Sequence, residues 1–148
     1  MTTAAVVGCG DVSIVHLEAI EALADSQLIA VCDTDPVTAA DVAGQWGVPA
    51  FADHHSMLAA IRPDVVHVCT PHDQHAPVIH DCLAAGVSVI VEKPLTHTLA
   101  EAEKVVAASD AAPAVRIGVC FQNRYNQTAQ WYSPPMLESS TRPSRRRS

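Results

Sequence analysis

The sequence lacks the features of secreted and membrane proteins. No apolar run approaches the roughly 18 residues that a membrane span requires, and the N-terminus has no basic start followed by an apolar stretch, as a signal peptide would. Its five cysteines are an odd number without a C-x-x-C pair, so neither a disulfide framework nor a zinc knuckle is indicated. We therefore expect a cytosolic protein, not bound to a membrane, whose cysteines are small buried side chains.

Basic residues are also scarce in most of the chain. Before residue 131 there are five Lys and Arg against fifteen Asp and Glu. Phosphate contacts need a basic face, so nucleic acid is not expected as the main ligand. From residue 131 the balance reverses to four Arg against one Glu, among three Pro and five Ser.

This C-terminal composition predicts a disordered tail over residues 129–148, because the segment has no apolar face to bury. A basic patch for nucleic acid or membrane, or a frameshifted end, would look similar. The preceding residues, 1–128, suffice for one domain, and the whole chain of 148 residues is too short for two.

The body of the chain alternates short apolar segments with helical patterns. Hydrophobic residues make up 49% of the sequence, which excludes a disordered chain. Strands are predicted at 4–7, 27–32, 48–51, 65–69, 87–91 and 115–120, and helices at 14–23, 36–46, 56–61, 75–85 and 99–109. This alternation predicts an α/β fold with a doubly wound parallel sheet, of the Rossmann type.

A glycine turn joins the first strand to the first helix. Gly8 permits a tight bend, and Gly10 leaves room for a pyrophosphate against the backbone. Asp11 and Val12 lead into the helix, whose first amides would face the anion. Ser13 stands where the dinucleotide-binding pattern has a third glycine, and a glycine turn without a ligand remains an alternative.

Asp33 ends the second strand, 23 residues after Gly10. An acid about 20 residues after the turn binds the adenosine ribose in dinucleotide-binding domains. A carboxylate there accepts two hydroxyl hydrogen bonds and repels a 2′-phosphate, so NAD is favoured over NADP. The alternative is a helix cap, a role that we assign to Asp35 before Pro36.

Polar residues follow the fourth and fifth strands, at Thr70-Pro71-His72 and at Glu92-Lys93. The carboxyl ends of the strands are where open α/β sheets bind ligands. His72 and His75 are three residues apart and could suggest a metal, but this spacing alone is weak evidence, so a metal is not expected.

These motifs resemble the N-terminal nucleotide-binding domain of the glucose-fructose oxidoreductase, inositol dehydrogenase and MocA family. The matching segments, over about residues 4–128, are GCGDVS with a downstream His16, VCDTDP, CTPHDQH, AAGVSVIVEKP and FQNRYN. The resemblance implies that Gly8, Gly10 and Asp33 bind the dinucleotide and that Thr70 and Pro71 line its path.

The resemblance also implies roles near the reacting end of the cofactor. It places His75 near the nicotinamide, and Glu92 and Lys93 beside the nicotinamide and its ribose. Lys93 would also reach the substrate hydroxyl and assist departure of its proton. The Lys93–Pro94 bond would be cis. Gln122, as a cofactor contact, and Arg124 would enter the substrate side.

Members of this family continue into a second domain, whereas here the similarity ends near residue 130. We therefore expect the nucleotide-binding domain of an oxidoreductase acting on a sugar, polyol or inositol-like hydroxyl, incomplete as an enzyme and not predicted to oligomerise. An S-adenosylmethionine-dependent transferase and a non-catalytic dinucleotide-binding module are the alternatives.

Overall fold

The computed structural model describes residues 1–125, and the predicted tail lies outside them. Six parallel strands form one sheet in the order β3-β2-β1-β4-β5-β6. They are β1 (Thr2–Val7), β2 (Ser26–Cys32), β3 (Ala50–Phe51), β4 (Val65–Val68), β5 (Ser88–Glu92) and β6 (Ile117–Cys120). This strand order is that of the dinucleotide-binding fold, so the predicted doubly wound parallel sheet is confirmed.

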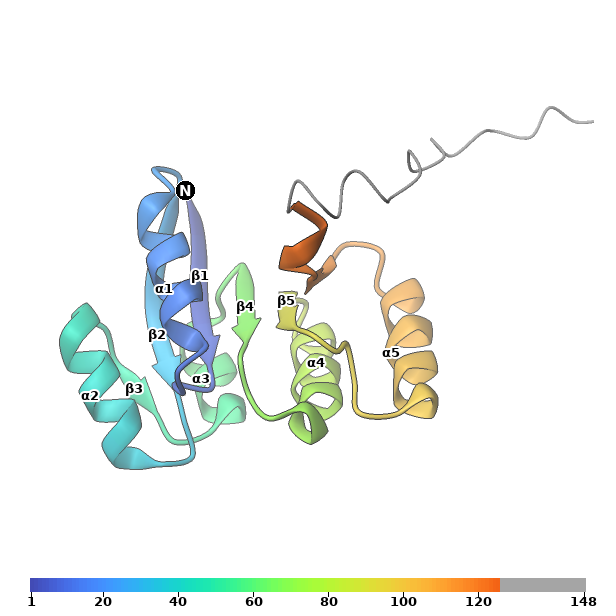
Figure 1. Cartoon of the computed structure of the whole chain (residues 1–148), viewed down its shortest axis with the longest axis horizontal. Helices are drawn as coiled ribbons and strands as arrows, with labels where there is room; N and C mark the ends of the chain where they lie inside the picture. The colour runs from blue at the N-terminus through green and yellow to red at the C-terminus, as the bar shows by residue number, and fades with distance from the viewer. Residues whose placement is uncertain (126–148) are drawn as a thin grey trace, which may run out of the picture.

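In the described part of the chain, five α-helices cover the two faces of the sheet (Figure 1). Helices α1 (Ser13–Ala22) and α2 (Pro36–Trp46) pack on one face. Helices α3 (His54–Ile61), α4 (His75–Ala84) and α5 (Leu99–Ala111) pack on the other. Two short 3₁₀ helices, η1 (His72–Gln74) and η2 (Gln122–Tyr125), follow β4 and β6. Within residues 1–125, no helix has both the length and the apolar character to span a membrane.

The strands are rich in small and β-branched residues because both faces of the sheet are covered. In β1, Ala5 and Val7 face the cluster under α3, α4 and α5, whereas Ala4 and Val6 face α1 and α2. All four side chains are at most 4% exposed. A polar residue on such a strand must therefore find a partner inside the protein.

Local signals set the ends of α2 as the sequence predicts. The Asp35 side chain accepts hydrogen bonds from the amides of Val37 and Thr38, and Pro36 occupies the first turn. Gly47 ends the helix with φ of 67°, in the left-handed region. Asp35 is therefore the cap, which leaves Asp33 available for another role.

Helix α3 begins at His54, two residues earlier than predicted. The reason is Asp53, whose carboxylate accepts a hydrogen bond of 2.8 Å from the Ser56 amide and so caps the helix. The prediction missed this cap and thereby left His54 and His55 outside the helix.

Four of the five cysteines are buried, as predicted, and Cys120 is partly exposed. Burial raises the pKa of Cys9 to about 11 and that of Cys32 to about 12, with nearby charges adding to the effect. Both thiols are therefore protonated and unreactive at neutral pH.

The order of the strands reverses where β1 lies between β2 and β4, and here the glycine turn meets the end of β4. Gly8 has φ of 91°. A Cβ atom on Gly8 would lie 2.6 Å from the backbone carbon of Cys69 and 2.7 Å from the nitrogen of Thr70. Only glycine fits at this position.

Gly8→Ala is therefore expected to destabilise the domain by about 3 kcal/mol or more, through backbone strain and collision with β4. Gly44→Ala is the matched control: Gly44 is an exposed residue of α2 whose added Cβ meets nothing within 4 Å. It should stabilise the domain by about 0.5–1 kcal/mol. Urea unfolding measures both. Equal stability of the Gly8 variant and the parent would contradict this role of Gly8.

Candidate functional site

A cavity of about 730 Å³ opens at the carboxyl ends of β1, β2 and β4. Ligands of open α/β sheets bind at this position, beside the reversal in strand order. The cavity brings together five of the residues that the sequence predicts to bind a dinucleotide: Gly8, Gly10, Asp33, Thr70 and Pro71. It is also lined by residues that the sequence did not point to, among them His54 and His55.

Asp33 is held in place by two backbone amides. Its Oδ2 accepts a hydrogen bond of 2.7 Å from Cys9, in the glycine turn, and its Oδ1 accepts one of 2.9 Å from Asp35. Each carboxylate oxygen has a second lone pair, so both can still accept a hydroxyl hydrogen bond. The contact with Cys9 fixes the Asp33 carboxylate relative to the glycine turn. The two groups are therefore placed so that one ligand can contact both.

The turn itself leaves open space above Gly10, where an added Cβ would meet nothing within 4 Å. Ser13, in place of the third glycine, is 2% exposed, and its hydroxyl donates a hydrogen bond of 2.6 Å to the Gly10 carbonyl. Asp11 is exposed, and Val12, 40% exposed, is the residue before α1. The serine therefore closes the turn without filling the space that a ligand would use.

Thr70 carries an unpartnered polar atom at the wall of the cavity. Its Oγ1 is buried and has no hydrogen-bond partner among the described residues. A buried hydroxyl without a partner costs about 1–3 kcal/mol, which a bound polar ligand would remove. Thr70 thus fits the predicted path of a dinucleotide.

His75 joins the two loops that carry the remaining motifs. It is 0% exposed, with Nδ1 lying 2.8 Å from the Pro94 carbonyl oxygen and Nε2 lying 2.9 Å from that of Thr70. The ring holds the end of β4 against the segment after β5. Its predicted position near the nicotinamide stays a prediction, because both ring nitrogens already face backbone carbonyls.

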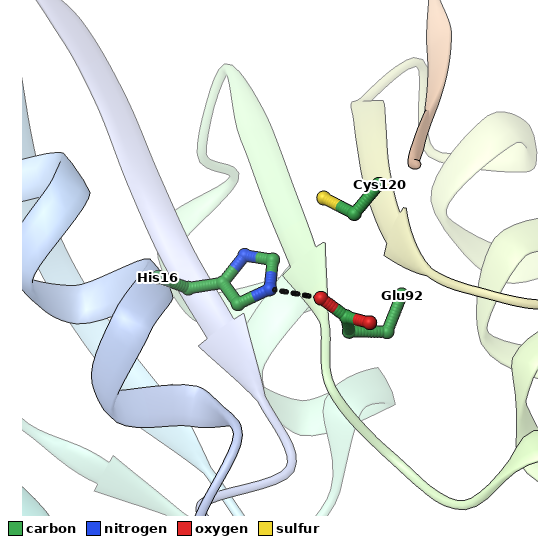
Figure 2. Close-up of side chains that lie close together, drawn as sticks. All are labelled: His16, Glu92 and Cys120. Carbon is green, nitrogen blue, oxygen red and sulfur yellow. Dashed lines mark hydrogen bonds and ion pairs between the residues drawn. The ribbon is translucent and has the colours of Figure 1, made fainter. Parts of the chain in front are cut away.

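Glu92 ends β5 and takes part in a chain of polar contacts with two histidines. His16 of α1 lies with Nε2 3.1 Å from Glu92 Oε1, and its Nδ1 lies 2.9 Å from Nδ1 of His67 in β4. Figure 2 shows the His16 ring turned toward Glu92, with the Cys120 side chain close by. The second oxygen of Glu92 accepts a hydrogen bond of 3.2 Å from the Lys93 amide.

The hydrogen bonds among His67, His16 and Glu92 depend on which ring nitrogens carry protons. Burial, and then the nearby His16, lowers the pKa of His67 to about 4, so His67 is neutral at pH 7. The contact between the two Nδ1 atoms needs a proton on one of them, and a proton on His16 Nε2 would be donated to the Glu92 carboxylate. The carboxylate is thereby held at the sheet edge.

The other predicted residues lie near this edge but outside the cavity. Lys93 is exposed, and the Lys93–Pro94 bond is cis, as the sequence resemblance implied. Gln122 is exposed in η2, which also contains Arg124. Burial and the Glu92 charge raise the pKa of Cys120, so its thiol stays protonated.

The contact between His16 and His67 was missed by the sequence analysis. His16 entered only as part of a motif, and His67 had no pattern. A usable signal did exist: His67 interrupts the buried strand VVHV, and a buried polar side chain needs a partner. The sequence offered no means of naming that partner.

The open space at Gly10, the fixed Asp33 carboxylate and the unpartnered Thr70 hydroxyl together fit an adenine dinucleotide. Each lies on the wall of one cavity.

Comparison with known proteins agrees with this arrangement. Residues 2–119 match the Gfo/Idh/MocA model, described as an oxidoreductase family with an NAD-binding Rossmann fold. An inositol 2-dehydrogenase of Rubrobacter xylanophilus is 32% identical over 122 residues, which cover 82% of this chain and 35% of that protein. A D-apiose dehydrogenase of Paraburkholderia graminis is 32% identical over 109 residues, covering 73% of this chain and 29% of that protein.

Among solved structures, the WlbA dehydrogenase of Chromobacterium violaceum, in complex with NADH and UDP-GlcNAcA, superposes with a TM-score of 0.83. It is 34% identical, and the match covers 88% of this chain and 38% of that one. The chain thus spans about a third of the length of the relatives that it matches.

The depressed pKa of His67 predicts acid sensitivity. The unfolded chain, with an ordinary histidine pKa of 6.5, binds the proton more readily than the folded one, with about 4. Stability is therefore complete above pH 6.5 and lost as pH falls toward 4. Between pH 7 and pH 5 we expect a loss of roughly 2 kcal/mol from this group, measured by urea unfolding.

His67→Gln should make this pH dependence shallower. His97→Gln, at an exposed histidine, is the control and should keep it. An unchanged slope in the His67 variant would show that other groups cause the acid sensitivity.

Proposed function

The chain belongs to the Gfo/Idh/MocA oxidoreductase family with its NAD-binding Rossmann fold, and on this premise we propose that it forms the cofactor half of an NAD-dependent dehydrogenase. The proposed reaction is hydride transfer between NAD and the carbon of a sugar, polyol or inositol-like hydroxyl. The names of the inositol and apiose dehydrogenases among its relatives support this substrate class.

The observation that carries the proposal is the pairing of Gly10 and Asp33 across one cavity. The fixed carboxylate of Asp33 would accept hydrogen bonds from the adenosine ribose, and the open space at Gly10 would admit the pyrophosphate. The amides at the start of α1 would face its negative charge. Thr70 and Pro71 would line the path toward the end of β5.

Bound NAD would supply the hydride acceptor. The group that we propose for proton transfer is Lys93, which is exposed directly after β5 and so free to meet a substrate. Its neutral amine would accept the hydroxyl proton at Nζ, and the ammonium so formed would stabilise the developing alkoxide. Glu92 would fix the Lys93 backbone through the 3.2 Å hydrogen bond to its amide.

Glu92 is in turn held by His16, so the chain of histidines would position the loop that carries the lysine. We propose that turnover occurs when this domain acts together with a substrate-binding domain. The part of the longer relatives that lies outside the match could supply such a domain. The family match favours this oxidoreductase function over a methyl transferase.

Gly10→Val tests the cofactor site without disturbing the fold. The parent chain should bind NADH with a dissociation constant between about 1 µM and 1 mM, the usual range of KM values. The valine would fill the space over the turn and weaken binding by about tenfold or more, measured by fluorescence titration.

The same variant should keep the unfolding free energy of the parent within about 0.5 kcal/mol. Gly44→Ala, at a glycine with equally open space that does not line the cavity, should leave the titration unchanged. Strong NADH binding by Gly10→Val would contradict the assignment, and tighter binding of S-adenosylmethionine than of NADH would favour the transferase.

Asp33→Asn tests the preference for NAD. Removing the negative charge should shift the ratio of NADPH to NADH affinity toward NADPH by about tenfold, because the 2′-phosphate is no longer repelled. The ratio is the proper measurement, since the substitution also disturbs the contact with Cys9 and so weakens both ligands.

Asp35→Asn is the matched control for this ratio. It makes the same change of charge two residues away, in the carboxylate that caps α2. It should cost stability but leave the ratio unchanged. If both variants shift the ratio equally, Asp33 has no specific contact with the ribose.

A further inference from the structure

A second group of side chains lies where α3 and α4 pack together. His54 and His55 are the first two residues of α3, and Asp81 belongs to α4. The cap that Asp53 forms with Ser56 fixes this first turn of α3 and therefore the positions of both histidines. The two histidines line the same cavity as Asp33, but the proposed binding of NAD assigns no contact to them.

The two imidazole rings converge on one carboxylate oxygen. His54 Nε2 lies 2.8 Å and His55 Nε2 lies 3.7 Å from Asp81 Oδ2. The ring centroids are 4.2 Å apart with an angle of 33° between the planes. One ligand atom from each of the three residues lies within 4.8 Å of the other two.

These separations are close to those around a bound transition metal. Zinc binds histidine nitrogen and carboxylate oxygen at about 2.0–2.2 Å, so ligand atoms of a tetrahedral site are about 3.3–3.6 Å apart. The two contacts to Asp81 lie on either side of that range. Since all three ligand atoms lie within 4.8 Å of one another, side-chain movements of about 1 Å would bring them to these separations.

A hydrogen bond explains the position of His54 but not that of His55. At 3.7 Å the second ring is too far from Asp81 for a hydrogen bond. The side chain of His55 is 68% exposed and could extend into solvent, yet its Nε2 faces the same oxygen as its neighbour. A cation bound between the two rings and Asp81 would account for both contacts.

We propose that His54, His55 and Asp81 form a binding site for a divalent transition-metal ion such as Zn²⁺ or Co²⁺. Two imidazole nitrogens with one carboxylate suit these ions, whereas Mg²⁺ and Ca²⁺ favour oxygen ligands. On binding, the proton of His54 Nε2 moves to Nδ1, so the ring binds as a neutral ligand. Three protein ligands leave a coordination position for water.

The surroundings favour a cation at this place. Asp53, whose carboxylate accepts hydrogen bonds from Ser56, places a further acidic side chain next to the two histidines. His54 and His55 also line the large cavity, which gives an ion a route in from solvent. The proposed metal site requires no contact with NAD, so it can be tested separately from the proposed function.

Titration of the reduced, metal-free chain with CoCl₂ tests the proposal through the visible absorption of the bound ion. We expect one equivalent to bind and added Zn²⁺ to displace it. His55→Ala and Asp81→Asn should each weaken the affinity by about tenfold or more, because each removes a ligand. His55 is exposed enough that its variant should fold as the parent does.

Two control variants exclude other sites. His97→Ala removes an exposed histidine outside the cluster and should bind like the parent. Cys120→Ser removes the thiol from the group formed with His16 and Glu92, the other set of metal-ligating side chains close together in residues 1–125 (Figure 2). It should also bind like the parent, and the spectrum should show no thiolate-to-cobalt band.

Three results would overturn the proposal. They are failure of the parent chain to bind cobalt, equal affinity of the parent and the His55→Ala and Asp81→Asn variants, and loss of binding in Cys120→Ser.

Discussion

The close contact between the first turn and the end of β4 determines the rest of the site. With no side chain on Gly8, the backbone of the turn lies directly against Cys69 and Thr70. This contact sets the two loops side by side, so that one cavity has the turn on one wall and Thr70 and Pro71 on another. Parallel pairing of β1 with both β2 and β4 then adds Asp33 to the same edge. A side chain at residue 8 would push these walls apart.

Much of the fold could be predicted because its signals are local. The apolar segments are separated by helical patterns, and this alternation alone implies a parallel sheet. Asp35 and Pro36 act on their own helix and were read correctly. The positions of the glycine turn and of Asp33 at the cavity were also predictable, since each follows directly after a strand, whereas their contacts with a dinucleotide stay a prediction. The start of α3 was misplaced because one cap, at Asp53, was overlooked.

The polar contacts between elements could not be predicted in the same way. His16, His67 and Glu92 come from α1, β4 and β5, and they meet only because β4 lies between β1 and β5. No spacing in the sequence encodes that neighbourhood. The same holds for His75, whose ring nitrogens reach two carbonyls from different loops. Polar contacts between different elements can be predicted only when the order and register of the strands are known, whereas contacts within one turn can be predicted from the sequence.

Gly8 and Gly10, the two glycines of the turn, are subject to different structural constraints. Residue 8 touches the protein's own backbone, whereas residue 10 borders empty space. In related proteins that no longer bind a nucleotide, selection for folding alone would keep glycine at residue 8 but not at residue 10. Substitution of residue 10 with retention of glycine at residue 8 would therefore distinguish family members that have lost the nucleotide but kept the fold from those that still bind it.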